Sequence, residues 1–143
     1  MTEWEFNHHT VSDEDTLYRR IPKKPDFRTW DPLTGRYTPN PAAFRREAQE
    51  GMSTHLDSVL QGRSRLPITL YDPDRYGSVG FHVATPRQAN AGVLLADDPY
   101  EKDEDLRCSH AEVRPPQPEK NRKHWKTVAN EIAMACWWVQ DPA

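Results

Sequence analysis

Residues 122–139 read RKHWKTVANEIAMACWWV, the longest segment in which apolar side chains repeat with a helical period. Apolar residues at steps of three and four fall on one face of a helix. That face would consist of Trp125, Val128, Ile132, Ala135 and Val139. The spacing predicts one terminal helix whose apolar face is buried against the domain. Trp137 and Trp138 cannot both face the same core, so one of them should stay partly exposed.

The segment before this helix, residues 66–113, has the pattern of short strands separated by turns. Alternating or short apolar runs predict strands over 66–71, 78–84, 93–96 and 106–113. The sequence DPDRYG predicts a turn between the first two of these strands. Thr85 and Pro86 favour a single helical turn between the second and the third.

The first third of the chain has a weaker pattern. LYRRI predicts a strand over 17–21 that Pro22 ends. Residues 22–41 are rich in proline, which predicts an extended, irregular segment with a turn at 31–35. Asn40 and Pro41 favour the start of a helix over 42–50 that ends at Gly51. Residues 53–60 predict a second short helix, and a strand through the same residues is the alternative.

These elements together predict the α+β class. We expect a small two-layer domain in which a C-terminal helix packs on an antiparallel sheet, with one or two short helices before the sheet. Residues 1–12 should form a flexible N-terminal arm and residues 13–143 a single domain, within which 22–41 is the proline-rich irregular segment.

Composition indicates the cellular location of the protein and the state of its thiols. The 143 residues carry a net charge of −3, and the mean hydropathy of −0.94 is strongly polar. No apolar run is long enough to span a membrane, and the acidic N-terminus does not resemble a signal peptide. Cys108 and Cys136 form no CxxC motif and no disulfide framework. We therefore expect a cytoplasmic protein with reduced thiols and no membrane partner.

Motifs for common chemistries are missing from the sequence. It contains no P-loop, GxGxxG, HExxH or GxSxG pattern. Residues 72–77 resemble the start of a calcium loop, but its twelfth position is Val83 instead of glutamate, so a turn is the better interpretation. We expect no metal and no cofactor. Of the six histidines, His55, His82 and His110 fall on predicted core elements, where a fold could bring them together. On the predicted strand 106–113, Cys108 and His110 would share a face.

Charged residues are clustered in three places. The densest positive set is Arg19, Arg20, Lys23, Lys24 and Arg28, hereafter the first basic set, with Trp30 close by. A second basic set opens the terminal helix and comprises Lys120, Arg122, Lys123, His124 and Lys126. Cations at a helix N-terminus oppose the helix dipole, so local stability does not explain this set. Residues 97–105 hold six carboxylates, a pattern typical of a solvated loop.

These observations favour an interaction or accessory module without catalytic activity. It would bind an anionic partner through a basic and aromatic surface formed by Arg19, Arg20, Lys23, Lys24, Arg28 and Trp30. We expect the partner to be a protein, with weaker binding to nucleic acid.

The alternative is a small enzyme that acts on a nucleotide or nucleic acid, nuclease-like or ADP-ribosyltransferase-like, with Arg19, His55 and His110 as candidate catalytic groups. An arginine-bearing first strand at Tyr18–Arg19, followed by the polar segment 53–55, resembles the order of NAD-contacting elements in ADP-ribosyltransferase-like folds. The sequence departs from that pattern because no glutamate follows on a strand with a hydroxyl two residues away.

Overall fold

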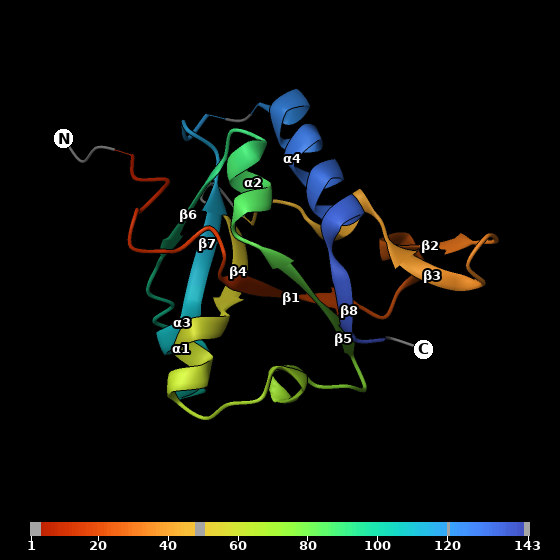
Figure 1. The fold of residues 1–143 in the computed structure, drawn as a ribbon, viewed down its shortest axis with the longest axis horizontal. Coiled ribbons are helices and arrows are strands. Elements are labelled where there is room, and N and C mark those ends of the chain that lie inside the picture. Colours follow the sequence, from red (N-terminus) through yellow and green to blue (C-terminus); the bar gives the residue numbers. More distant parts are fainter. Residues whose placement is uncertain (1–3, 48–50, 120, 142–143) are drawn as a thin grey trace.

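The computed structural model describes residues 4–47, 51–119 and 121–141 and has the expected α+β class. Six antiparallel strands form one sheet in the order β6-β7-β4-β1-β5-β8 (Figure 1). Its strands are β1 (Thr16–Pro22), β4 (Met52–Leu56), β5 (Tyr76–His82), β6 (Gly92–Leu95), β7 (His110–Arg114) and β8 (Trp137–Gln140). The helices are α1 (Asp57–Gly62), α2 (Ala84–Gln88), α3 (Glu104–Ser109) and α4 (Arg122–Ala135).

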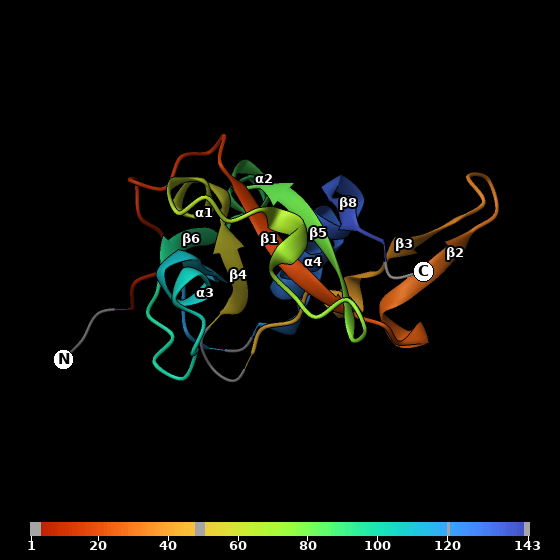
Figure 2. The ribbon, with the colours of Figure 1, turned by 90° about the horizontal axis from the view of Figure 1, so that it is seen from below.

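The sheet has an apolar face and a mixed face. Leu17 and Ile21 of β1 point to the face on which α4 packs with Val128 and Ile132, and all four are fully buried. Because side chains alternate along a strand, Tyr18 points to the opposite face. There α1, α3 and the segment around the 3-10 helix η3 (Pro67–Thr69) lie over the sheet (Figure 2). The C-terminal helix therefore packs on the sheet as predicted.

The terminal helix is shorter than predicted. It ends at Ala135, and the last residues form β8, which pairs with β5. Tryptophan and valine favour strands, and the exposed edge of β5 offers hydrogen-bond partners to this segment. Ala135 is exposed, not buried in the apolar stripe. Trp137 is 40% exposed, which confirms that one of the two neighbouring tryptophans stays partly outside the core.

Three other element predictions need correction. Over the described part of the predicted helix at 42–50, residues 42–47, only one 3-10 turn forms, η2 (Pro41–Ala43), and residues 48–50 lie outside the described residues. The expected strand at 66–71 is replaced by η3, because Pro67 at its first position suits a helical turn. The expected strand at 106–113 is divided into α3 and β7. Asp103 causes this division, since its carboxylate caps α3 by accepting from the backbone N–H groups of Asp105 and Leu106.

Residues 53–60 combine both of the structures that the sequence left open. Residues 52–56 form β4, and α1 follows directly at Asp57. The 17–21 strand, the 72–77 turn and the strands at 78–84 and 93–96 form close to the predicted positions as β1, β5 and β6 with their connections.

The proline-rich segment is more regular than predicted. After the 3-10 helix η1 (Pro25–Phe27), β2 (Arg28–Asp31) and β3 (Arg36–Pro39) form a hairpin that projects from the domain in Figure 1. The expected turn at 31–35 is confirmed, and Gly35 supplies the positive φ of 67°. The Trp30 and Tyr37 rings, paired across the strands, meet edge to face at 5.1 Å. Cross-strand aromatic pairs of this kind stabilise a hairpin whose two strands pair with no other strand of the described residues.

The described part of the N-terminal arm lies along the domain. The Trp4 indole N–H donates to the Pro115 carbonyl oxygen, and the His8 backbone N–H donates to the Val93 carbonyl oxygen. Val11 is buried in the main core.

Candidate functional site

Polar side chains gather on the mixed face of the sheet, where β4 and β7 pair. In the register of these strands, His55 lies opposite His110 and Ser53 opposite Glu112. The two imidazole rings meet at 5.9 Å, so the fold does bring His55 and His110 together. Nε2 of His110 lies 2.9 Å from Ser53 Oγ, and Nδ1 of His110 lies 2.7 Å from the Ala96 carbonyl oxygen.

Tyr71 completes this polar cluster from the segment after η3. Its hydroxyl lies 2.6 Å from His55 Nδ1 and 3.2 Å from the Tyr18 carbonyl oxygen. Burial, together with the charge of neighbouring His110, lowers the pKa of His55 to about 3. Burial likewise raises the pKa of Tyr71. His55 and Tyr71 are therefore both uncharged near neutral pH.

The other candidate histidine and the candidate thiol lie elsewhere. His82 is exposed and contacts Trp137, with 5.0 Å between the ring centres. Cys108 is exposed on α3, whereas His110 begins β7. The single strand that would have aligned Cys108 with His110 does not form.

Arg19 is used inside the fold. It points to the apolar face, where Nη1 donates to the Ser53 carbonyl oxygen at 2.9 Å and also binds the Glu47 carboxylate. Its Nε donates to the Ala43 carbonyl oxygen. Burial lowers the pKa of Arg19, and Glu47 opposes this shift. A guanidinium remains charged in such a setting, so Arg19 ties β1 to β4 and to the segment after η2.

The other members of the first basic set lie at the end of β1, in the segment after it and at the start of the hairpin. Arg20 stacks over the Tyr76 ring at 5.3 Å, while Arg28 stacks over Tyr37 of the hairpin at 4.3 Å. Lys23 and Lys24 are exposed between these two stacks, and Trp30 is exposed on the hairpin. Of the predicted binding residues, the structure thus places Arg19 inside the fold, whereas Arg20, Lys23, Lys24 and Trp30 are exposed.

A basic groove lies instead between η2 and the first half of α4. Its volume is about 730 Å³, within the range typical of ligand pockets. Its apolar lining consists of Pro41, Ala42, Phe44, Trp125 and Ala129. Its cations are Arg45, Arg46, Arg122 and Lys126, and no carboxylate is among the described residues that line it. We call this hollow the α4–η2 groove.

The groove's cations contrast with six arginines elsewhere in the protein. Ion pairs with aspartate or glutamate hold Arg19, Arg63, Arg65, Arg87, Arg107 and Arg114. Among the described residues, Arg45, Arg122 and Lys126 have no such carboxylate partner, and all three are exposed. Arg46 lies 6.0 Å from the Trp125 ring centre and donates to the Pro118 carbonyl oxygen.

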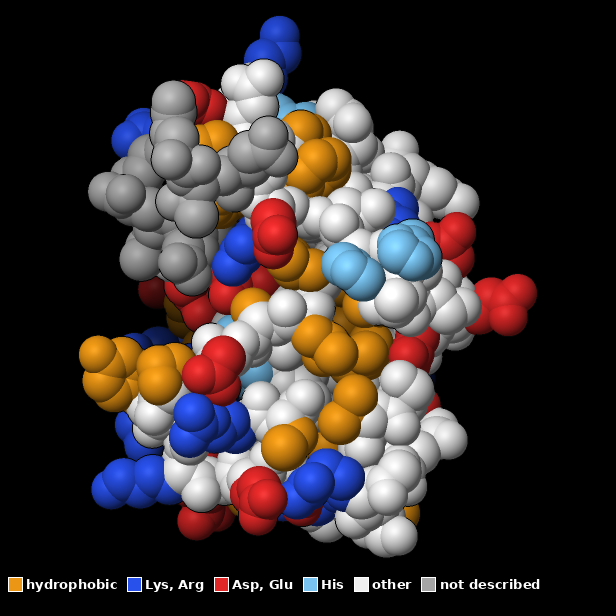
Figure 3. Space-filling model, turned by 90° about the vertical axis from the view of Figure 1, so that its left-hand side faces the viewer, with side chains coloured by type: hydrophobic (Ala, Val, Ile, Leu, Met, Phe, Trp, Pro, Cys, Tyr) orange, Lys and Arg blue, Asp and Glu red, His pale blue; other side chains and the backbone are white. Residues whose placement is uncertain are grey.

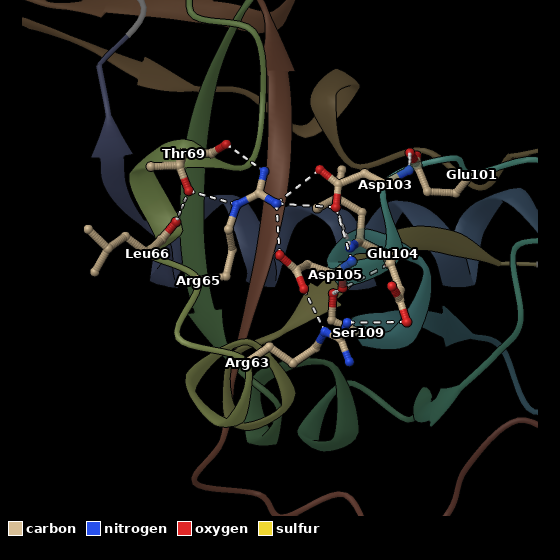
Figure 4. Close-up of polar contacts among 10 residues, drawn as sticks. Arg63, Arg65, Leu66, Thr69, Glu101, Asp103, Glu104, Asp105 and Ser109 are labelled. Carbon is tan, nitrogen blue, oxygen red and sulfur yellow. Dashed lines mark hydrogen bonds and ion pairs between the residues drawn. The ribbon is translucent and has the colours of Figure 1, made fainter.

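The acidic run is engaged by arginines of the same chain (Figure 4). Arg65 Nη1 lies 2.9 Å from Asp103 Oδ2 and 3.1 Å from Asp105 Oδ2. Arg63 binds Asp105 and Glu104. Hydrogen bonds from the two arginines lower the pKa of Asp105. These carboxylates hold α3 to the segment after α1, which accounts for much of the run without an external ligand.

Charged side chains are mixed on another side of the molecule. Acidic, basic and histidine side chains intermix on the side shown in Figure 3, without a large area of one charge. Over residues 4–47, 51–119 and 121–141, no helix is long and apolar enough to cross a bilayer. The same residues contain no group of three or more metal-ligating side chains.

Comparison of the chain with models of protein families, with curated proteins and with solved structures finds no match. The site must therefore be interpreted from its own residues. Sequence reasoning missed Arg45, Arg46 and Tyr71. The basic pair at 45–46 and the unexplained cations that open α4 were signals for the groove, but their proximity depends on tertiary packing. Lys120 of the second basic set lies outside the described residues.

Proposed function

We propose that the protein is an interaction module whose α4–η2 groove binds an acidic segment of a partner protein. One observation carries this proposal: Arg45, Arg122 and Lys126 surround a hollow and lack carboxylate partners among the described residues, whereas six arginines elsewhere are held in ion pairs. Clustered cations repel one another, so the free energy of this surface falls when an anionic ligand arrives.

The chemistry of the groove suits a peptide carboxylate next to an apolar side chain. Guanidinium groups bind carboxylates through two parallel hydrogen bonds, which Arg45 and Arg122 can offer because neither has a carboxylate partner among the described residues. Trp125 is half-buried and its indole N–H already donates to the Phe44 carbonyl oxygen at 2.8 Å. The ring is thereby fixed and can pack against an apolar residue of the ligand.

The shape of the surface supports an extended ligand. A second hollow, of about 620 Å³, adjoins the groove and shares Asn121 and Arg122 with it. An extended chain could cross from one hollow into the other around the start of α4. The net charge of −3 and the mixed charges outside the groove disfavour a long polyanion, because a nucleic acid would meet repulsion beyond the groove.

The test is a titration with a fluorescent polyglutamate peptide that contains one phenylalanine. Arg45→Glu with Lys126→Glu reverses two exposed charges in the groove and should weaken binding by about 100-fold, on roughly 1.4 kcal/mol per reversed charge. Lys23→Glu with Lys24→Glu makes the same charge change in the first basic set and should leave the affinity within about threefold.

The outcomes separate the proposal from its rivals. An equal loss of peptide affinity in the two double variants would indicate nonspecific attraction between charges and would contradict a binding site in the groove. A greater loss in the Lys23 and Lys24 variant would place the site on the first basic set. Tighter binding of a DNA duplex than of the peptide, with affinity falling steeply as salt rises, would favour nucleic acid as the partner.

A further inference from the structure

Ser53, His110 and the Ala96 carbonyl form a hydrogen-bonded series that the groove does not use. The carbonyl oxygen of Ala96 can only accept, so Nδ1 of His110, 2.7 Å away, must carry a proton. In the neutral ring Nε2 then has a lone pair, and the hydroxyl of Ser53 donates to it at 2.9 Å. The backbone contact thus sets the imidazole tautomer that a general base requires.

We propose that Ser53 is the nucleophile of an acyl-transfer site, with His110 as its general base and the Ala96 carbonyl as the group that orients the imidazole. A hydroxyl, a base within hydrogen-bond reach and a third group that holds the base are the parts such a site needs. Ser53 is half-buried, so part of this residue is open to solvent, whereas His110 is buried.

The surroundings hold both partners in place. Ser53 is fixed from the opposite face of the sheet, where Arg19 Nη1 donates to its carbonyl oxygen. His55 packs against His110 as a neutral ring and is held by Tyr71. Ser53 and His110 also lie on the paired strands β4 and β7, and strands position side chains more rigidly than loops do.

The charges nearby select an uncharged carboxylic ester as the substrate class. Glu112 lies opposite Ser53 in the strand register and is bound by Arg114, with both of its oxygens 3.3 Å from guanidinium nitrogens. Arg19 is held by Glu47. Phosphoryl transfer requires cations aimed at the phosphate oxygens, and both of these arginines already bind glutamates.

The reaction balances with water as the second reactant. Ser53 Oγ bonds to the ester carbonyl carbon while its proton passes to Nε2 of His110. The bond to the alcohol oxygen breaks, and the imidazolium returns the proton to the departing alkoxide. Water then attacks the acyl-serine with His110 again as the base, which releases the carboxylic acid and restores the hydroxyl.

Covalent labelling tests this proposal directly on the full chain. A phosphonofluoridate probe forms a bond from phosphorus to a reactive serine oxygen and expels fluoride, and peptide mass spectrometry locates the adduct. We expect the adduct at Ser53 and none at Ser58, which is exposed on α1. His110→Asn keeps an amide donor for the Ala96 carbonyl and removes the base, so it should slow labelling by about 100-fold or more. Ser58→Ala is the control and should label like the wild type.

A second measurement does not depend on any variant. p-Nitrophenyl acetate should leave an acetyl group on Ser53 of the wild-type protein. No adduct at Ser53 with either reagent would overturn the proposal, as would unchanged labelling in His110→Asn. The variant with Arg45→Glu and Lys126→Glu should label normally, so failure of the groove proposal and failure of this one can be distinguished.

Discussion

The Arg46 guanidinium lies 6.0 Å from the centre of the Trp125 ring, and this contact joins the chain after η2 to α4. The Trp125 indole N–H donates to the Phe44 carbonyl oxygen across the same junction. Two segments about 80 residues apart in sequence are thereby held as the walls of one groove. Burial lowers the pKa of Arg46, yet a guanidinium stays charged, so the junction contributes its cation to the groove.

The packing of α4 on the sheet depends on Ile132. This side chain is fully buried in the main core. Ile132→Ala should lower the free energy of unfolding by about 2–5 kcal/mol, through lost transfer energy and a cavity. Met134→Ala, on the exposed side of the same helix, should cost less than about 0.5 kcal/mol. Urea denaturation of both variants is the measurement, and equal midpoints would refute the assignment of faces.

His55 should make stability depend on pH. Its pKa is about 3 in the folded protein, compared with 6.5 when unperturbed. Between these values the unfolded chain binds the extra proton, so the contribution of His55 is complete above about pH 6.5 and is lost as the pH falls toward 3. The loss should reach up to about 1.4 kcal/mol per pH unit. His55→Asn should flatten this part of the stability profile, whereas His82→Asn, at an exposed site, should follow the wild type.

Gly92 should control the docking of the N-terminal arm. A Cβ at this position would overlap the Phe6 carbonyl oxygen and lie 2.5 Å from the Asn7 Cβ. Gly92→Ala should therefore displace the arm and speed hydrogen exchange of the His8 amide, which is bonded to the Val93 carbonyl. Gly62→Ala is the control, because a Cβ there meets nothing within 4 Å. Unchanged His8 exchange in Gly92→Ala would contradict the described contacts.

The two thiols should react at different rates. Burial raises the pKa of Cys136 to about 11, whereas Cys108 is exposed on α3. The thiolate is the reactive form, so a maleimide at pH 7 should modify Cys108 well before Cys136. Mass spectrometry over time is the measurement, and faster modification of Cys136 would show that it is not held in the core.

The sequence predicted those parts of the fold that depend on local pattern. Asn40 caps η2, Gly35 provides the hairpin turn, and Val128 with Ile132 faces the core, because each signal acts over a few residues. The end of α4 was mispredicted because β8 forms only when the edge of β5 is available. Tertiary pairing of this kind overrides the helical spacing of 137–139.

The candidate site was predicted less well than the fold. The sequence left open whether His55 and His110 meet, and the fold brings their rings together because both lie on strands of the sheet. The first basic set was predicted as a surface from its density in sequence, but Arg19 alternates into the core side of β1 and so cannot face a partner. The groove was not predicted because residues 41–46 and 121–129, which line it, are far apart in sequence and meet only in the folded protein.

The most direct test of the groove is a two-dimensional NMR titration of the five tryptophan indole N–H signals with the polyglutamate peptide. Trp125 lines the groove, whereas Trp30 lies exposed on the hairpin beside the first basic set. We expect the Trp125 signal to shift progressively with peptide while the Trp30 signal stays in place. A Trp125 signal that does not move at peptide concentrations up to about 1 mM, the limit of weak specific binding, would contradict the proposed function.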